Sequence, residues 1–158
     1  MNGGTVNGLL IGVGNEFRND DALGILVARE IRRRNIPGIR VMERSGEGAA
    51  LMEAWTGADQ VIIVDAIFQG KSPGIIHRLD AVHEEIPRGF FHYSSHAFGV
   101  AEAVGVAKAL STLPPRVILY GIEGKEFGEG TGLSDQVLKS IPGLIAMIEE
   151  DFHAFHTA

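Results

Sequence analysis

Cysteine is absent from this sequence of 158 residues, and its absence excludes several kinds of chemistry. A chain without thiols forms no disulfide bond, offers no thiolate to a metal and has no cysteine nucleophile. Chains without disulfide bonds are typical of a reducing compartment, so we expect the protein to be cytoplasmic. The amino-terminal segment MNGGTVNG also lacks the basic and apolar regions of a secretory signal.

Positive charge and long apolar runs are scarce as well. Lys and Arg number 14 against 20 Asp and Glu, which gives a formal net charge of -6. A surface of that sign repels phosphates, so we expect no nucleic-acid partner. The one dense basic run, at 32–34, falls where a helix is expected to end, and cations there complement the helix dipole. No apolar run approaches the roughly 20 residues of a membrane-spanning helix, so we expect no membrane span.

What the chain does contain is an alternation of apolar runs and amphipathic segments. Hydrophobic residues make up 45% of it, which is enough for one core, so we expect a single domain over 1–158. Strands are expected at 6–13, 39–42, 61–64, 74–79 and 116–122, and helices at 20–34, 49–55, 96–110 and from 134 onward. Pro142-Gly143 is expected to break or kink the last helix, and its end to fray from about Asp151. This order predicts an α/β three-layer sandwich, in which helices cover both faces of a twisted, mostly parallel sheet of about five strands.

A glycine-rich turn followed by two acids stands out near the start, in LLIGVGNEFRNDDALG. The glycines suggest a dinucleotide-binding turn, but the pattern G-x-G-x-x-G fails because Phe17 occupies the third glycine position. The acids Asp20 and Asp21 would also repel a phosphate. We interpret Asp20, or the asparagine before it, as the cap of the following helix and Asp21 as a free carboxylate. A capping role for either acid is the alternative.

Three side chains suited to a metal fall at corresponding places in this topology. Asp21 follows the first strand, Asp65 ends the third, and His96 begins the helix before the last strand. Because ligands bind beyond the carboxyl ends of parallel strands, we expect all three at one crevice. Two carboxylates and one imidazole suit a divalent metal with an open coordination position. The structural alternatives are a helix cap for Asp21, a turn for Asp65 and a surface position for His96.

The other histidines are weaker candidates. His92 could pair with His96 on one helix face, but Ser94 or Ser95 is expected to cap the helix and to leave His92 outside it. The histidines expected at the surface are His77, His83, His153 and His156.

Four stretches, in this order along the chain, resemble the hydrogenase maturation endopeptidases, which trim the large subunit of nickel–iron hydrogenases. They are GVGNEFRNDDALG, VIIVDAI, SSHAFGVAEAV and ILYGIE, the last followed by GLS. The resemblance implies that Asp21, Asp65 and His96 hold a metal, which is the set that the topology suggests. It also implies that the protein removes a short C-terminal extension from the large-subunit precursor after nickel has been inserted.

The resemblance further implies that nickel arrives with the substrate, so the resting site is expected to be empty or to hold an adventitious divalent metal. Substrate thiolates and water would complete the nickel shell, and the metal would align the scissile peptide and polarise its carbonyl or activate water. Asp20 is a further candidate for a general base. Phe17-Arg18 and Gly124-Lys125 depart from the family's usual residues, and because they lie in loops they bear on partner choice more than on chemistry.

Two other functions stay open at this point. A nickel-sensing or docking module without catalytic activity would use the same three ligands, so the sequence does not separate it from a peptidase. A metal-dependent hydrolase of a small molecule would need a closed, deep pocket.

Overall fold

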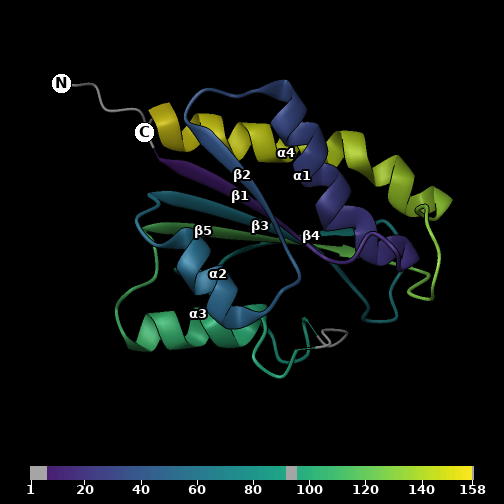
Figure 1. The fold of residues 1–158 in the computed structure, drawn as a ribbon, viewed down its shortest axis with the longest axis horizontal. Helices are drawn as coiled ribbons and strands as arrows, with labels where there is room; N and C mark the ends of the chain where they lie inside the picture. Colours follow the sequence, from purple (N-terminus) through teal and green to yellow (C-terminus); the bar gives the residue numbers. More distant parts are fainter. Residues whose placement is uncertain (1–6, 92–95, 158) are drawn as a thin grey trace.

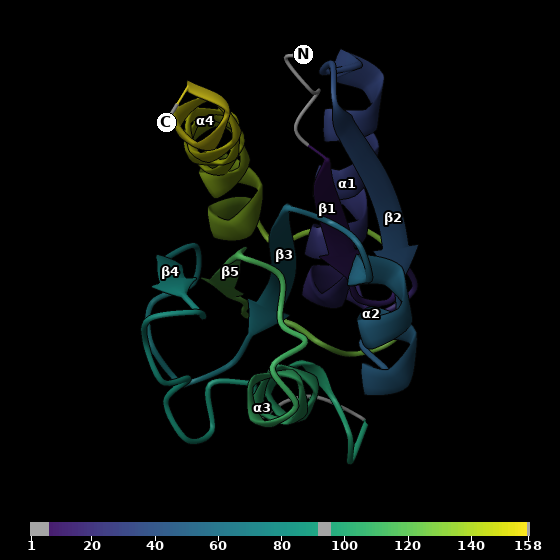
Figure 2. The same ribbon diagram turned by 90° about the vertical axis from the view of Figure 1, so that its left-hand side faces the viewer.

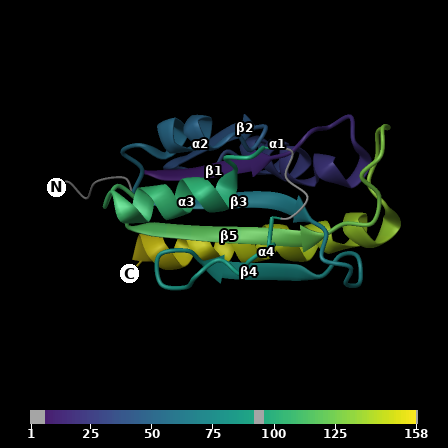
Figure 3. The ribbon, with the colours of Figure 1, turned by 90° about the horizontal axis from the view of Figure 1, so that it is seen from below.

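A sheet of five strands lies at the centre of the computed structural model, which describes residues 7–91 and 96–157 (Figure 1). The strands are β1 (Gly8–Val13), β2 (Ile39–Arg44), β3 (Gln60–Ile67), β4 (Ile76–Asp80) and β5 (Arg116–Glu123). Their order across the sheet is β2-β1-β3-β5-β4. The first four strands in this order are parallel, whereas β4 pairs antiparallel with β5 and points the opposite way in Figure 3. The α/β class and the mostly parallel sheet are therefore confirmed.

Helices cover both faces of this sheet. Helices α1 (Leu23–Arg34) and α4 (Asp135–Thr157) lie on one face, and α2 (Gly48–Trp55) and α3 (Val100–Ala109) on the other (Figure 2). Each face has its own buried apolar cluster, and the two clusters take alternate residues of the strands between them. This arrangement is the predicted three-layer sandwich. None of the helices in the described part of the chain has the length and apolarity that a membrane-spanning segment requires.

The central strands β1 and β3 are buried along their whole length because both of their faces are covered. Strand β3 is longer than expected and runs to Ile67, so Asp65 lies within the strand instead of ending it. The reason is that the ladder with β5 continues past Asp65, which pairs with Gly121, to the pair of Ile67 and Glu123. Asp65 nevertheless stays near the carboxyl end of β3.

Two helix starts differ from the prediction. The segment expected to begin α1 forms a short 3-10 turn, η1 (Asn19–Ala22), and the carboxylate of Asp20 caps neither this turn nor α1, so that expectation was wrong. Helix α3 begins at Val100 instead of His96, because the Glu102 side chain accepts the backbone N–H of Gly99 and caps the helix there. The expected capping residues Ser94 and Ser95, and His92, lie outside the described residues.

Helix α4 runs without a break from Asp135 to Thr157, so of the expected break or kink at Pro142-Gly143 the break was wrong. Pro142 and Gly143 are exposed, and water can therefore bond the carbonyl group that the proline leaves unpaired. The helix also does not fray at Asp151. The carboxylate of Asp151 is buried and accepts hydrogen bonds from Arg78, Arg116 and the hydroxyl of Tyr120, which fixes the end of α4 to the sheet.

His77 is a further correction, because it does not lie at the surface as expected. It is half-buried in β4, and its ring meets the ring of Phe90 edge to face at 6.0 Å between centroids. His83 is exposed, with 76% of its side chain accessible, and His153 is exposed as well.

Candidate active site

Three glycines allow the start of α1 to pack directly on the end of β1. A Cβ atom on Gly12 would lie 2.1 Å from the carbonyl oxygen of Gly24, and one on Gly24 would lie 2.3 Å from a carbonyl oxygen of β1. Gly14 has a φ of 150°, and a Cβ there would lie 2.0 Å from the carbonyl oxygen of Asp21. The N–H of Asn15 donates to that same oxygen at 3.1 Å. These contacts fold the turn back on itself and hold Asp21 beside the carboxyl end of the sheet.

Asp21 and Asp65 line one small cavity at this edge, which we call the inner cavity. Its volume is about 40 Å³, and Arg18, Ser45 and Gly46 are among its other lining residues. A space of that size holds an ion or one or two water molecules, and it is smaller than the few hundred Å³ of a typical small-molecule pocket. The structure therefore brings two of the three predicted ligands together.

The two carboxyl groups of the inner cavity have raised pKa values. Burial raises the pKa of Asp21 to about 6, although the charge of Arg18 and a hydrogen bond from Asn15 oppose the shift. Burial, and next the charge of Asp21, raise the pKa of Asp65 well above its ordinary value. Two neighbouring carboxylates that repel each other are stabilised by a shared proton or by a cation.

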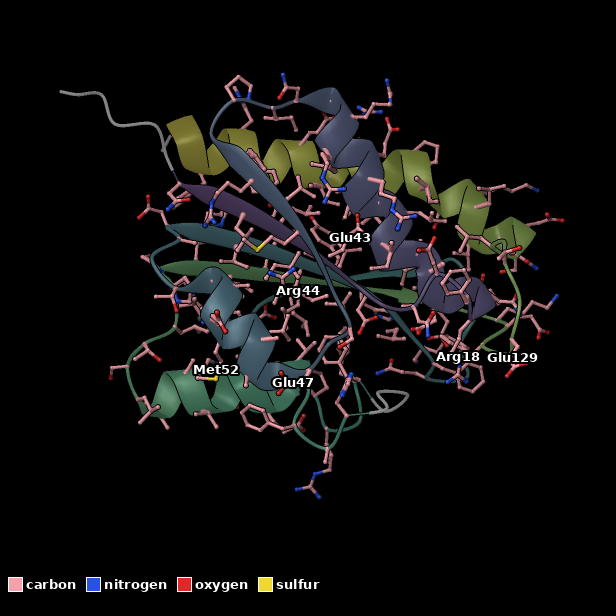
Figure 4. The ribbon with its side chains drawn as sticks, in the orientation of Figure 1. Arg18, Glu43, Arg44, Glu47, Met52 and Glu129 are labelled. Carbon is pink, nitrogen blue, oxygen red and sulfur yellow. The ribbon has the colours of Figure 1, made fainter. Side chains whose placement is uncertain are left out.

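His96 lines a neighbouring cavity of about 340 Å³, which we call the outer cavity and which Asp21 also lines. The ring of His96 lies against the loop between β2 and α2. A Cβ atom added to Gly46 of that loop would lie 3.7 Å from the Cδ2 atom of His96. Two backbone N–H groups of α2, and to a smaller extent the charge of His96, lower the pKa of Glu47 in that loop. Glu47 is labelled in Figure 4.

The compact cluster of three ligands that the sequence predicts is not found in the structure. Within residues 7–91 and 96–157, no three His, Asp or Glu side chains lie close enough together to hold a metal ion. Asp21 lines both cavities, Asp65 only the inner cavity and His96 only the outer cavity. Two carboxylate oxygens and an imidazole nitrogen fit a divalent metal such as nickel in their chemistry. Joint ligation by all three stays a prediction.

Asp20 has a different role from its neighbour. Its side chain is fully buried, and its two oxygens accept the backbone N–H groups of Lys125, Glu126 and Ser134 at 2.8–2.9 Å, together with the Ser134 hydroxyl. Burial alone would raise the pKa of Asp20, but these hydrogen bonds hold the pKa below its ordinary value. A carboxylate of low pKa is a weak base, so the structure favours an anchoring role over the predicted role in catalysis.

The sequence marks Phe17-Arg18 and Gly124-Lys125 only as loop residues that bear on partner choice, and it does not reveal that Arg18 and the loop at 124–134 contact each other at this edge. Arg18 lines both cavities, and its Nε and Nη2 atoms donate to the carbonyl oxygen of Phe127 at 3.2 and 3.0 Å. Arg18 also forms a parallel β-bridge with Gly130 of this loop. Figure 4 shows Arg18 close to Glu129, the neighbouring residue of the same loop. The available signals were the polar turn after β1 and the acidic, glycine-rich loop after β5.

Solved structures with a similar fold include hydrogenase maturation endopeptidases. The hydrogenase maturating endopeptidase HybD from Escherichia coli superposes with a TM-score of 0.70 at 19% identity, over 93% of this chain and 92% of that one. A nickel–iron hydrogenase maturation protease HycI from Thermococcus kodakarensis gives 0.69 at 21% identity, over 92% and 91%. At these identities the comparison shows the fold alone.

Sequence comparison defines the family. The model of the hydrogenase maturation protease family matches residues 25–151, so the chain belongs to this family. The hydrogenase 2 maturation protease of E. coli is 28% identical over 145 residues, which are 89% of this chain and 83% of that protein. The hydrogenase expression/formation protein HupD of Thiocapsa roseopersicina is 26% identical over 147 residues, and the match spans 66% of its length, about two thirds. The match to the family model includes Asp65 and His96 and begins just after Asp21.

Proposed function

We propose that this protein is an endopeptidase that removes a short C-terminal extension from the nickel-loaded large-subunit precursor of a nickel–iron hydrogenase. Membership of the hydrogenase maturation protease family supports the reaction class. The observation that carries the proposal is the pair of carboxyl groups, half-buried Asp21 and buried Asp65, that lines a cavity of about 40 Å³ next to the larger cavity that His96 lines.

In this proposal the nickel ion belongs to the substrate. Asp21, Asp65 and His96 would coordinate it, and the substrate's own ligands would complete its shell. The negative charges of half-buried Asp21 and buried Asp65 disfavour each other in the free protein, and a dication relieves that repulsion. A nickel-loaded precursor would therefore bind more tightly than a nickel-free one, which makes the metal a checkpoint for processing.

The nickel would then act on the peptide bond by polarising its carbonyl group or by lowering the pKa of a bound water. The residues of this chain would position the metal ligands around that peptide bond. Asp21 is held at the cavity by the contact of its backbone with Gly14 and Asn15, and Asp20 fixes the loop at 124–134 behind it. The outer cavity offers the polar space that a peptide needs, whereas the inner cavity is too small for the substrate of a small-molecule hydrolase.

The test is a processing assay with a large-subunit precursor in nickel-loaded and nickel-free forms. We expect the mass of the C-terminal extension to be lost only from the nickel-loaded form, as measured by mass spectrometry. The Asp21→Asn and Asp65→Asn variants should lose processing. Asp59→Asn is the matched control, because Asp59 is an exposed carboxylate at the opposite edge of the sheet, before β3.

The competing docking function predicts a different result in the same assay. A protein that binds the nickel-loaded precursor and leaves its mass unchanged would contradict the peptidase proposal. Equal processing of the two forms of the precursor would contradict the role of nickel.

A further inference from the structure

Arg18 occupies a central place at the carboxyl edge that the proposed reaction does not use. It lines the inner cavity, the outer cavity and a third space of about 610 Å³ beside the loop at 124–134. Among the described residues, it is the sole Lys or Arg that lines these three spaces. The residue is exposed, so its charge is accessible to a bound polypeptide.

The guanidinium group of Arg18 is fixed along one edge. Its Nε and Nη2 atoms both donate to the carbonyl oxygen of Phe127, and its backbone is held between hydrogen bonds of Phe17 and Asn19 with Gly130. A guanidinium group has five N–H donors, so these bonds leave both N–H groups of Nη1 and one of Nη2. That remaining edge has the planar, two-pronged form that matches a carboxylate.

The positive charge of Arg18 has no ion-pair partner within residues 7–91 and 96–157. Two other acids of the outer cavity, Glu16 and Glu43, pair with Arg29 at 2.9 and 3.1 Å. The carbonyl oxygen of Phe127 requires only a hydrogen-bond donor, which a neutral side chain could supply. The contact with the loop therefore requires neither the charge of Arg18 nor the open edge of its guanidinium group.

We propose that Arg18 is a specificity residue that binds a carboxylate of the C-terminal extension of the substrate, an inference that rests on the proposed function. The carboxylate is either the free C-terminus of the extension or an acidic side chain within it. The surrounding acids would repel such a group, whereas Arg18, the sole Lys or Arg among the described lining residues, attracts it. Its pairing with Arg18 would set the direction in which the extension lies across the site.

The first arm of the test compares enzyme variants on the nickel-loaded precursor. Arg18→Gln should raise KM by about 10- to 100-fold, the loss expected for a charge-assisted hydrogen-bonded pair, and leave kcat within about 3-fold. Arg18→Lys should fall between, because it keeps the charge and loses the planar fork. Arg40→Gln is the matched control, since Arg40 is an exposed arginine in the first half of β2, away from the carboxyl edge, and KM should not change.

The second arm changes the substrate and keeps the wild-type enzyme. One precursor ends in a C-terminal amide, and in another the acidic side chains of the extension are replaced by amides. One of these changes should raise KM as much as Arg18→Gln does, and it should have no further effect on the Arg18→Gln enzyme. The substrate that shows this behaviour identifies the source of the carboxylate.

Several results would overturn the inference. An unchanged KM in Arg18→Gln, or wild-type kinetics that neither substrate change affects, removes the carboxylate contact. A fall in kcat at unchanged KM would also contradict the carboxylate contact. It would indicate instead that Arg18 stabilises the negative charge that develops on the oxygen of the scissile carbonyl group. If Arg18→Gln does not fold, the substrate arm decides alone. If the wild-type protein binds the precursor without cleaving it, the proposed function fails, and the same comparisons made with dissociation constants still test Arg18.

Discussion

Replacement of Asp20 by asparagine should destabilise the fold far more than the same change at an exposed carboxylate. Asp20 is fully buried, and its Oδ2 atom accepts the N–H groups of Lys125 and Glu126 at 2.8 and 2.9 Å. An amide group has one accepting oxygen, so its orientation leaves either the N–H group of Ser134 or those of Lys125 and Glu126 without an acceptor. At about 1–3 kcal/mol for each unsatisfied buried donor, the free energy of unfolding falls by about 1–6 kcal/mol.

Chemical denaturation and thermal melting measure this loss. For a chain of this length, the expected fall in Tm is about 10 °C. Ser134→Ala removes only the hydroxyl donor to Asp20 and should cost about 1 kcal/mol. Asp59→Asn, which changes an exposed carboxylate, should stay within about 0.5 kcal/mol of the wild type.

The pH dependence provides an independent check on the same carboxylate. Hydrogen bonds hold the pKa of folded Asp20 below its ordinary value against the effect of burial. Its contribution to stability is therefore complete above the unfolded pKa of about 4 and is lost as the pH falls through the folded pKa. The wild-type protein should lose stability in this acid range more steeply than Asp20→Asn. Stabilities of the two proteins that agree within about 0.5 kcal/mol at pH 7 would refute the anchoring role of Asp20.

Three further predictions concern the scaffold. Gly24→Ala should prevent folding or lower stability by about 3 kcal/mol or more, since its Cβ would lie 2.3 and 2.4 Å from two strand carbonyl oxygens; a melting curve like that of the wild type would contradict this. Gly105→Ala, in α3 with nothing within 4 Å of the added Cβ, should instead raise stability by about 0.5–1 kcal/mol in the same measurement. Asp151→Asn should cost about 3–5 kcal/mol in urea denaturation, because it leaves Arg78 and Tyr120 without their acidic partner; a loss under about 1 kcal/mol would show that the cluster is not coupled.

The sheet and the general place of the site could be predicted from the sequence because their signals are local. The runs LLIGV and VIIV are apolar without alternation, which indicates strands covered on both faces. Since the carboxyl ends of parallel strands share one edge, the positions of Asp21 and Asp65 followed from the order of the elements alone.

What the sequence could not reveal depends on contacts between distant segments. The donors that bind Asp20 are more than 100 residues away, so local reasoning interpreted it as a helix cap. The end of α4 is fixed by the ion pairs of Asp151 with β4 and β5, which outweigh the tendency of a terminus to fray. The start of α3 was predicted too early because Ser94 and Ser95 are typical capping residues. In the structure the helix is capped by Glu102, which lies within its first turn.

The proposed ligands are carried by different layers of the sandwich. Asp21 precedes α1 on one face of the sheet, Asp65 lies in the sheet itself, and His96 precedes α3 on the opposite face (Figure 2). A single ion held by all three would act as a mechanical cross-link through the whole thickness of the molecule.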